Sequence, residues 1–262
     1  MNTDVLFEAA KTADKASGLL RSRGLSDKIR YFISPERPEG LEKKGFMLLF
    51  PYVLRSSSEE GLLKLLERER PERILIRNIE ELGFLKDIGY RGEIHADSSL
   101  YSFNRESIKA LEGLGISECT CPEELNIHEL RERGLSDSVL KVYGRTPLMV
   151  SAQCTKKTVS GKCEKKPFGF FSEIRDRKKA VFPVRAECGY CYNVIYNSVP
   201  LMLFKEAEEL GGSGPAAVRL DFTVERAEEA VDITECFIRG RDETLNKLIK
   251  GYTKGHFRKG VE

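Results

Sequence analysis

Four cysteines are the residues of this sequence best suited to chemistry. They are Cys154, Cys163, Cys188 and Cys191, in the spacing C-x8-C-x24-C-x2-C. Thiolates are soft ligands that select zinc or an iron–sulfur cluster over hard cations. Structural zinc usually takes two close cysteine pairs, and only Cys188 and Cys191 form one, whereas irregular spacing is common among cluster ligands. The pattern predicts an iron–sulfur cluster, with zinc, or buried thiols without a metal, as the alternatives.

A β-hairpin would gather these cysteines. Two apolar runs, PFGFF (167–171) and AVFPV (180–184), flank the charged turn RDRKK (175–179), which is a typical hairpin pattern. Folding about Arg177 places Cys163 opposite Cys191, because each lies 14 residues from that midpoint. We therefore expect the metal site at the base of this hairpin.

Composition indicates a cytoplasmic protein without a membrane partner. No apolar run has the length of a signal-peptide core or of a membrane span. Seven cysteines are an odd number, which argues against a closed set of disulfides, and Cys119, Cys121 and Cys236 are expected in the core. The 43 basic and 41 acidic residues nearly balance, so there is no bulk attraction to nucleic acid.

Repeating strand–helix units must position these groups. Strand candidates recur every 20–25 residues, each followed by a helical segment, at 46–54, 73–78, 92–97, 116–121, 138–144 and 216–223. This rhythm implies parallel strands with crossover helices. Residues 1–26 predict one helix and 35–45 a linker, so 1–45 is interpreted as an N-terminal helical and linker segment. Residues 46–262 then form the barrel domain, with a cysteine-rich insertion at about 150–195.

These are six parallel-strand candidates, or seven with a short strand in SDKIRYFISPERPEG (26–40), slightly short of eight. The predicted fold is therefore α/β, an incomplete or open (β/α)8 barrel of the TIM type that carries an inserted cysteine-bearing β-hairpin. An ordinary open α/β sheet is the alternative.

Polar residues at the ends of the strand candidates form a second candidate site, because active sites of such folds collect there. They are Arg55, Arg77, Asn78, Asp97, Arg145, Arg219 and Asp221. Converging arginines would suit a phosphate or carboxylate group of a substrate. In the alternative interpretation each is a solvated loop charge, or Arg219 and Asp221 form a structural ion pair.

The C-terminal tail and the missing motifs bear on the class of function. The run KGHFRKG surrounds Phe257 with basic residues and could touch an RNA backbone with one stacked base, or be a frayed end. The sequence has no HExxH, G-x-S-x-G, P-loop or GxGxxG motif and only three histidines. A Ser–His–Asp or Cys–His protease site is therefore hard to assemble.

Several runs resemble peptidase family U-thirty-two, the collagenase-like proteases. The similar runs are VYGRTPLMVSAQC, CGYCYNVIYNSVPL, RLDFT, GHFRKGVE, FPYVLR, IRNIEELGF and ADSSLYSFN, and the resemblance covers about 46–262. It implies a (β/α)8-like barrel and a four-iron four-sulfur cluster held by Cys154, Cys163, Cys188 and Cys191. Better understood members of the family act in hydroxylation of uridine or cytidine in tRNA or rRNA, or of ubiquinone precursors.

Two departures from the family pattern shape the functional expectation. The usual opening half is absent, and Lys141 and Met149 stand where the family has a glutamate and a cysteine. We expect a divergent or truncated member, whose barrel a second chain or self-association would complete. The expected function is an iron–sulfur-dependent enzyme of RNA modification, hydroxylating a pyrimidine. The alternatives are a peptidase, as the family name says, or a non-catalytic, metal-stabilised subunit of a larger assembly.

Overall fold

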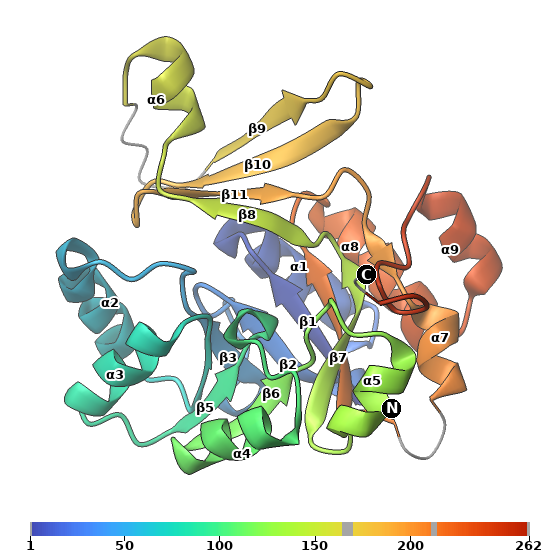
Figure 1. Cartoon of the computed structure of the whole chain (residues 1–262), viewed down its shortest axis with the longest axis horizontal. Coiled ribbons are helices and arrows are strands. Elements are labelled where there is room, and N and C mark those ends of the chain that lie inside the picture. The colour runs from blue at the N-terminus through green and yellow to red at the C-terminus, as the bar shows by residue number, and fades with distance from the viewer. Residues whose placement is uncertain (1, 164–169, 211–213, 261–262) are drawn as a thin grey trace.

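Eight parallel strands form the centre of the computed structural model, which describes residues 2–163, 170–210 and 214–260 (Figure 1). In ring order they are β1 (Asn2–Phe7), β2 (Ile29–Ser34), β3 (Phe46–Leu49), β4 (Arg73–Ile76), β5 (Glu93–Ala96), β6 (Ile116–Thr120), β7 (Ser138–Gly144) and β13 (Ala217–Phe222). Pairing of β6 with β7 closes the ring. The fold is a closed α/β barrel of the TIM type.

Helices flank this barrel (Figure 1). They are α1 (Ala10–Ser22), α2 (Ser56–Glu69), α3 (Ile79–Asp87), α4 (Arg105–Gly113), α5 (Ile127–Arg133), α7 (Phe204–Glu209), α8 (Ala227–Ile238) and α9 (Asp242–Leu248). Between β2 and β3 there is only a short 3-10 turn, Lys43–Gly45. In the described part of the chain, no helix combines the length and the apolar character needed to cross a membrane.

The first 45 residues belong to the barrel, so the prediction of a single helix over 1–26 is wrong for residues 2–7. These residues form β1, which pairs with β13 and β2 and is buried from Thr3 onward. The first half of β1 is polar (Asn2, Thr3 and Asp4), and its short apolar run, 5–7, leads almost directly into the alanine-rich α1, so the sequence resembles the start of a helix. Because β1 supplies the missing strand, the TIM-like barrel is confirmed but is closed, not incomplete or open.

The cysteine-rich insertion forms a second, antiparallel sheet of four strands, in the order β8 (Pro147–Ser151), β11 (Tyr192–Tyr196), β10 (Val181–Glu187) and β9 (Phe170–Arg175). The predicted hairpin is confirmed as β9 and β10, although part of its first run lies outside the described residues. Val181 pairs with Arg175, so the hairpin centres on Lys178, one residue from the expected midpoint. Residues 164–169 lie outside the described residues, so the expected position of Cys163 opposite Cys191 stays a prediction. We call these four strands the small sheet.

The chain returns to the barrel through a short strand, β12 (Leu201–Met202), that pairs antiparallel with β7. The helix that follows, α7, begins at Phe204. The C-terminal tail packs beside β12, since the backbone N–H of Met202 donates to the carbonyl of Thr253 at 3.0 Å.

Candidate functional site

The small sheet lies over the end of the barrel at which the parallel strands finish (Figure 1). Its first strand, β8, follows β7 after two residues. The backbone N–H of Tyr52, in the loop after β3, donates to the hydroxyl of Tyr192 at 3.0 Å. Arg55 Nε donates to the carbonyl of Tyr190 at 3.2 Å. These bonds hold the small sheet across the barrel mouth, where active sites of this fold lie.

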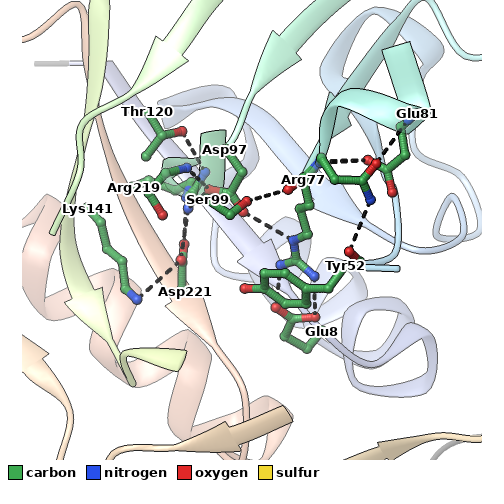
Figure 2. A network of polar contacts seen from close by, with 12 residues as sticks. Glu8, Tyr52, Arg77, Glu81, Asp97, Ser99, Thr120, Lys141, Arg219 and Asp221 are labelled. Carbon is green, nitrogen blue, oxygen red and sulfur yellow. Dashed lines mark hydrogen bonds and ion pairs between the residues drawn. The ribbon is translucent and has the colours of Figure 1, made fainter. Parts of the chain in front are cut away.

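A buried ion-pair network crosses the barrel mouth (Figure 2). Arg77 donates to Glu8 from Nη1 at 3.1 Å and to Asp97 from Nε at 3.1 Å. Arg219 donates to the other oxygen of Asp97 at 2.8 Å and to Asp221 at 2.7 Å. All five residues are at most 7% exposed. The network therefore joins charges from four different strand ends in a dry environment.

Lys141 extends the network on one side. Its ammonium lies 3.7 Å from Asp221 and donates to Glu123 at 2.9 Å. The other oxygen of Glu123 accepts a hydrogen bond from the hydroxyl of Thr146 at 2.6 Å. On the opposite side Arg185 Nη1 lies 3.8 Å from Glu8, and Arg185 Nε donates to Glu187.

Burial and pairing set the protonation states in this network. Burial alone would raise the pKa of Asp97, but the Arg219 and Arg77 guanidiniums outweigh it and hold that pKa below its usual range. Burial would likewise lower the pKa of Lys141, but Glu123 and Asp221 raise it. Lys141 is therefore a cation, not a neutral amine that could act as a nucleophile.

The carboxyl group of Glu81, beside the network, has a raised pKa, in contrast to Asp97. Burial raises the pKa of Glu81 to about 8, although the backbone N–H groups of Arg77 and Asn78 donate to its Oε2. Its Oε1 is buried and makes no hydrogen bond with the described residues. Glu81 is thus largely protonated at neutral pH, and it closes the N-terminal turn of α3 in a capping box with Asn78.

Two cavities open at the barrel mouth. The first, which we call the β8 cavity, has a volume of about 230 Å³ and lies between β8 and the loops that follow β3, β5, β6 and β7. The second, the α1 cavity, has about 250 Å³ and lies between the small sheet and the loops that follow β1 and β2. The network reaches both, because Glu123 and Thr146 line the β8 cavity and Arg185 and Glu187 line the α1 cavity.

Three of the four insertion cysteines lie at one end of the small sheet. Cys188 and Cys191 flank the turn from β10 to β11, in which Glu187 pairs with Tyr192. Cys154 follows β8, at the end where β8 runs beside the start of β11. Gly189 and Tyr190, the two residues inside the turn, form part of the wall of the α1 cavity.

The same four thiols are at least partly exposed, whereas Cys119, Cys121 and Cys236 are buried. The donor set therefore suits a soft metal, with four accessible thiols in the small sheet and its connections. Within the described ranges, however, no three His, Cys, Asp or Glu side chains are arranged around a common metal position. The backbone N–H of Lys157 donates to the sulfur of Cys154 at 3.4 Å.

The strand-end residues predicted as a substrate site divide into two groups. Arg77, Asp97, Arg219 and Asp221 meet in the network, and the alternative of an Arg219–Asp221 ion pair is confirmed. The other three make rim contacts: Asn78 caps α3, Arg55 bonds the small sheet, and Arg145 donates to the carbonyls of Asn197 and Ser198. A role of these seven residues in substrate binding stays a prediction.

Sequence reasoning missed Glu8, Glu123 and Arg185. Glu8 follows the strand that was predicted as helix, so it was not recognised as a strand-end residue. Lys141 stood out only as a departure from the family pattern, and it pairs with Glu123 and Asp221 at one side of the network. Met149, the other departure, lines the β8 cavity.

The tail does not offer Phe257 for stacking on a base. Phe257 is 3% exposed, and its carbonyl accepts a hydrogen bond from the backbone N–H of Ile127 at 2.9 Å. Lys254 pairs with Glu206. The tail is therefore packed against α5 and α7, neither frayed nor presented for stacking.

No protein-family model and no curated protein matches this sequence. Two solved structures are distantly similar in fold. One is the C-terminal domain of a protein named as a chitinase from Desulfitobacterium hafniense DCB-2, with a TM-score of 0.40 and 8% identity over 91% of this chain and 99% of that one. The other is a chitinase from Chromobacterium violaceum ATCC 12472, with a TM-score of 0.36 and 8% identity over 90% and 99%. Similarity this weak carries no argument about function.

Proposed function

We propose that this protein is an iron–sulfur-dependent enzyme of RNA modification, which hydroxylates a pyrimidine bound at the barrel mouth. The observation that carries the proposal is the position of the Cys188–Cys191 turn, which forms part of the wall of the α1 cavity. Ligands for a redox cofactor thereby lie next to a space at the strand ends where a substrate could bind.

Cys154, Cys163, Cys188 and Cys191 would hold the cluster, which when bound supplies one-electron transfer. The resemblance of their segment to the collagenase-like family supports iron over zinc. All four are accessible to an incoming cluster, unlike the three cysteines of the barrel. A metal on these cysteines would join the ends of β8 and β10 and fix the wall of the α1 cavity.

The α1 cavity offers chemistry that suits a nucleotide. Phe171 is 44% exposed and could stack on a base. Two basic residues, Lys11 and Arg185, lie in the same lining together with two acidic residues, Glu36 and Glu187, so the lining has no net charge that would repel a nucleotide. The ion-pair network next to the cavity holds the strand ends in fixed positions. Groups on these strand ends are therefore already in place when a substrate binds, which favours reaction.

The peptidase function has less support. His95 lies between Glu93 and Glu118, and His256 Nδ1 lies 2.9 Å from the carbonyl of Gly260. In the part of the chain that the structure describes, no histidine bonds to a serine hydroxyl or a thiol. A partner is not required to complete the barrel, because the eight strands of this chain close it.

Metal analysis tests the proposal most directly. Protein purified without oxygen should contain iron and acid-labile sulfide at about four each per chain. Cys188→Ala and Cys191→Ala should lose both, whereas Cys236→Ala, which removes a buried thiol on α8, should keep them. A colourless protein that holds zinc would contradict the cluster.

The RNA substrate needs a separate measurement. In cells that lack this protein, one hydroxylated pyrimidine nucleoside should disappear from total RNA, and the wild-type gene but not Cys188→Ala should restore it. An unchanged nucleoside profile in the presence of a cluster-loaded protein would refute RNA as the substrate.

A further inference from the structure

The β8 cavity is acidic and aromatic, and it is separate from the cysteines. Loops after four barrel strands, β3, β5, β6 and β7, supply its polar groups, and β8 supplies an apolar strip. Among the described residues that line it there is no lysine, arginine or histidine. Its volume of about 230 Å³ is smaller than the cavities of drug-sized ligands, which begin near 300 Å³, so a small group would fill it.

Glu124 is the unusual residue of the β8 cavity. Its neighbour Glu123 is satisfied by Lys141 at 2.9 Å and Thr146 at 2.6 Å. Glu124 is half-buried and makes no hydrogen bond or ion pair with the described residues. A carboxylate that is partly withdrawn from water gains most from a charged hydrogen-bond donor, and the protein provides none at this position.

Aromatic side chains form the rim of the β8 cavity. Tyr101 lines it and stacks on Phe103 with ring centroids 5.7 Å apart and planes within 8°. Both rings are exposed, at 56% and 40%. Tyr101 also has a φ of 52°, a left-handed conformation that costs a residue with a side chain roughly 1 kcal/mol or more. The fold therefore holds Tyr101 in the lining of the cavity at an energetic cost, with Phe103 stacked on its ring.

We propose that the β8 cavity binds a small organic cation, a guanidinium, amidinium or ammonium group on an apolar stem. The charged head bonds Glu124, with the hydroxyls of Ser98 and Ser99 as further acceptors. The stem lies along Leu148 and Val150, and the ring electrons of Tyr101 attract the charged head.

The arginines near the β8 cavity argue against an anionic ligand. A phosphate or carboxylate would meet two carboxyl groups in the lining. The N–H groups of Arg77 and Arg219 that could bind it already donate to Glu8, Asp97, Asp221 and Thr120. An anion would have to displace a buried carboxylate from an arginine, whereas a cation would neutralise the carboxylate of Glu124.

Three isosteric probes test this site on the protein without a cluster, so the result does not depend on the proposed RNA function. Benzamidine, benzamide and benzoate are titrated separately and followed by nuclear magnetic resonance shifts. Benzamidine should bind, benzamide at least tenfold more weakly, and benzoate not measurably. Glu124→Gln should weaken benzamidine about tenfold. Glu132→Gln, an exposed glutamate on α5 outside the lining, should leave the affinity unchanged.

Two results would overturn the proposal: equal affinity for benzamide and benzamidine, or an unchanged benzamidine affinity in Glu124→Gln. A further pair of probes identifies the source of the cation, since β8 is an edge strand to which an extended peptide could pair. A blocked Leu-Arg-Val tripeptide that binds tenfold more tightly than blocked arginine would support a protein side chain. Equal affinities would support a free small molecule.

Discussion

Replacing Asp97 by asparagine should destabilise the protein more than any single change at its surface. Asp97 lies between two guanidiniums, at 3.1 Å from Arg77 Nε and 2.8 Å from Arg219 Nη2. Asparagine keeps the size of the side chain but removes its charge. One oxygen becomes an NH2 group, whose hydrogens face an N–H donor of an arginine.

The expected size follows from burial. Asp97, Arg77 and Arg219 are each at most 4% exposed, so water cannot replace the lost charge. Removing one partner of a buried ion pair leaves an uncompensated charge and typically costs about 3–5 kcal/mol. For a domain of this size about 3 kcal/mol corresponds to a fall in Tm of about 6–12 °C.

The pH dependence of stability reports on the same ion pairs of Asp97. The pKa of Asp97 is below its usual range in the folded protein, so the unfolded chain binds this proton first as the pH falls. The stability that Asp97 contributes is therefore fully present above about pH 5 and is lost in more acidic solution. The difference between wild type and Asp97→Asn should shrink below about pH 4.

Urea unfolding at pH 7 and at pH 3.5 measures the cost of Asp97→Asn and its dependence on pH. The comparison requires that the free energy of unfolding falls with urea concentration at the same slope in wild type and variant. Asp87→Asn, an exposed aspartate at the end of α3, serves as the matched control and should change stability by less than about 0.5 kcal/mol. A cost below about 1 kcal/mol for Asp97→Asn at pH 7, or a cost that grows in acid, would show that the network does not hold charges as described.

Two further predictions concern Glu81 and the tail. Because burial raises the pKa of Glu81 to about 8, the wild type loses stability as the pH rises from about 5 to 8, since the unfolded chain ionises first. Glu81→Gln keeps a side chain that can cap α3 and should exceed the wild type by at least about 1 kcal/mol at pH 8 but not at pH 5, measured by urea unfolding; equal differences at both pH values would contradict this. Phe257→Ala should lower the free energy of unfolding by about 3–5 kcal/mol, because the ring is 3% exposed. Tyr252→Ala, whose ring is 43% exposed, is the control and should cost far less in the same assay. Similar losses of stability in the two variants would argue against a docked tail.

The barrel could be predicted where its strands alternate with helices. From β3 to β7 each predicted strand is present, because short β-rich runs and helical periods are separated by loops. The prediction failed at β1, whose apolar residues continue into α1 without a glycine or proline. That single error turned a closed barrel into an apparently incomplete one. It also suggested that a partner chain was needed to complete it.

Only the ion pairs within one strand or between neighbouring strands could be predicted from the sequence. Arg219 and Asp221 are two apart on one strand, so their side chains share a face and their ion pair is visible in the sequence. Arg77 and Asp97 follow neighbouring parallel strands and could also be placed together. The pair of Arg77 with Glu8 spans 69 positions and depends on β1, so no local pattern reveals it.

This distant pairing changes what the barrel mouth can bind. Arginines at successive strand ends indicate an anion site only if their donors are free, and here buried carboxylates accept them. A ligand at the mouth must therefore be recognised by groups at the two ends of the network. One end offers the exposed ring of Phe171 beside the cysteine turn, which suits the base of a nucleotide. The other offers Glu124 and Tyr101, which suits a cation. The β8 cavity should therefore select ligands by charge, whereas the α1 cavity, in which Glu36 and Glu187 balance Lys11 and Arg185, should select them by stacking on Phe171.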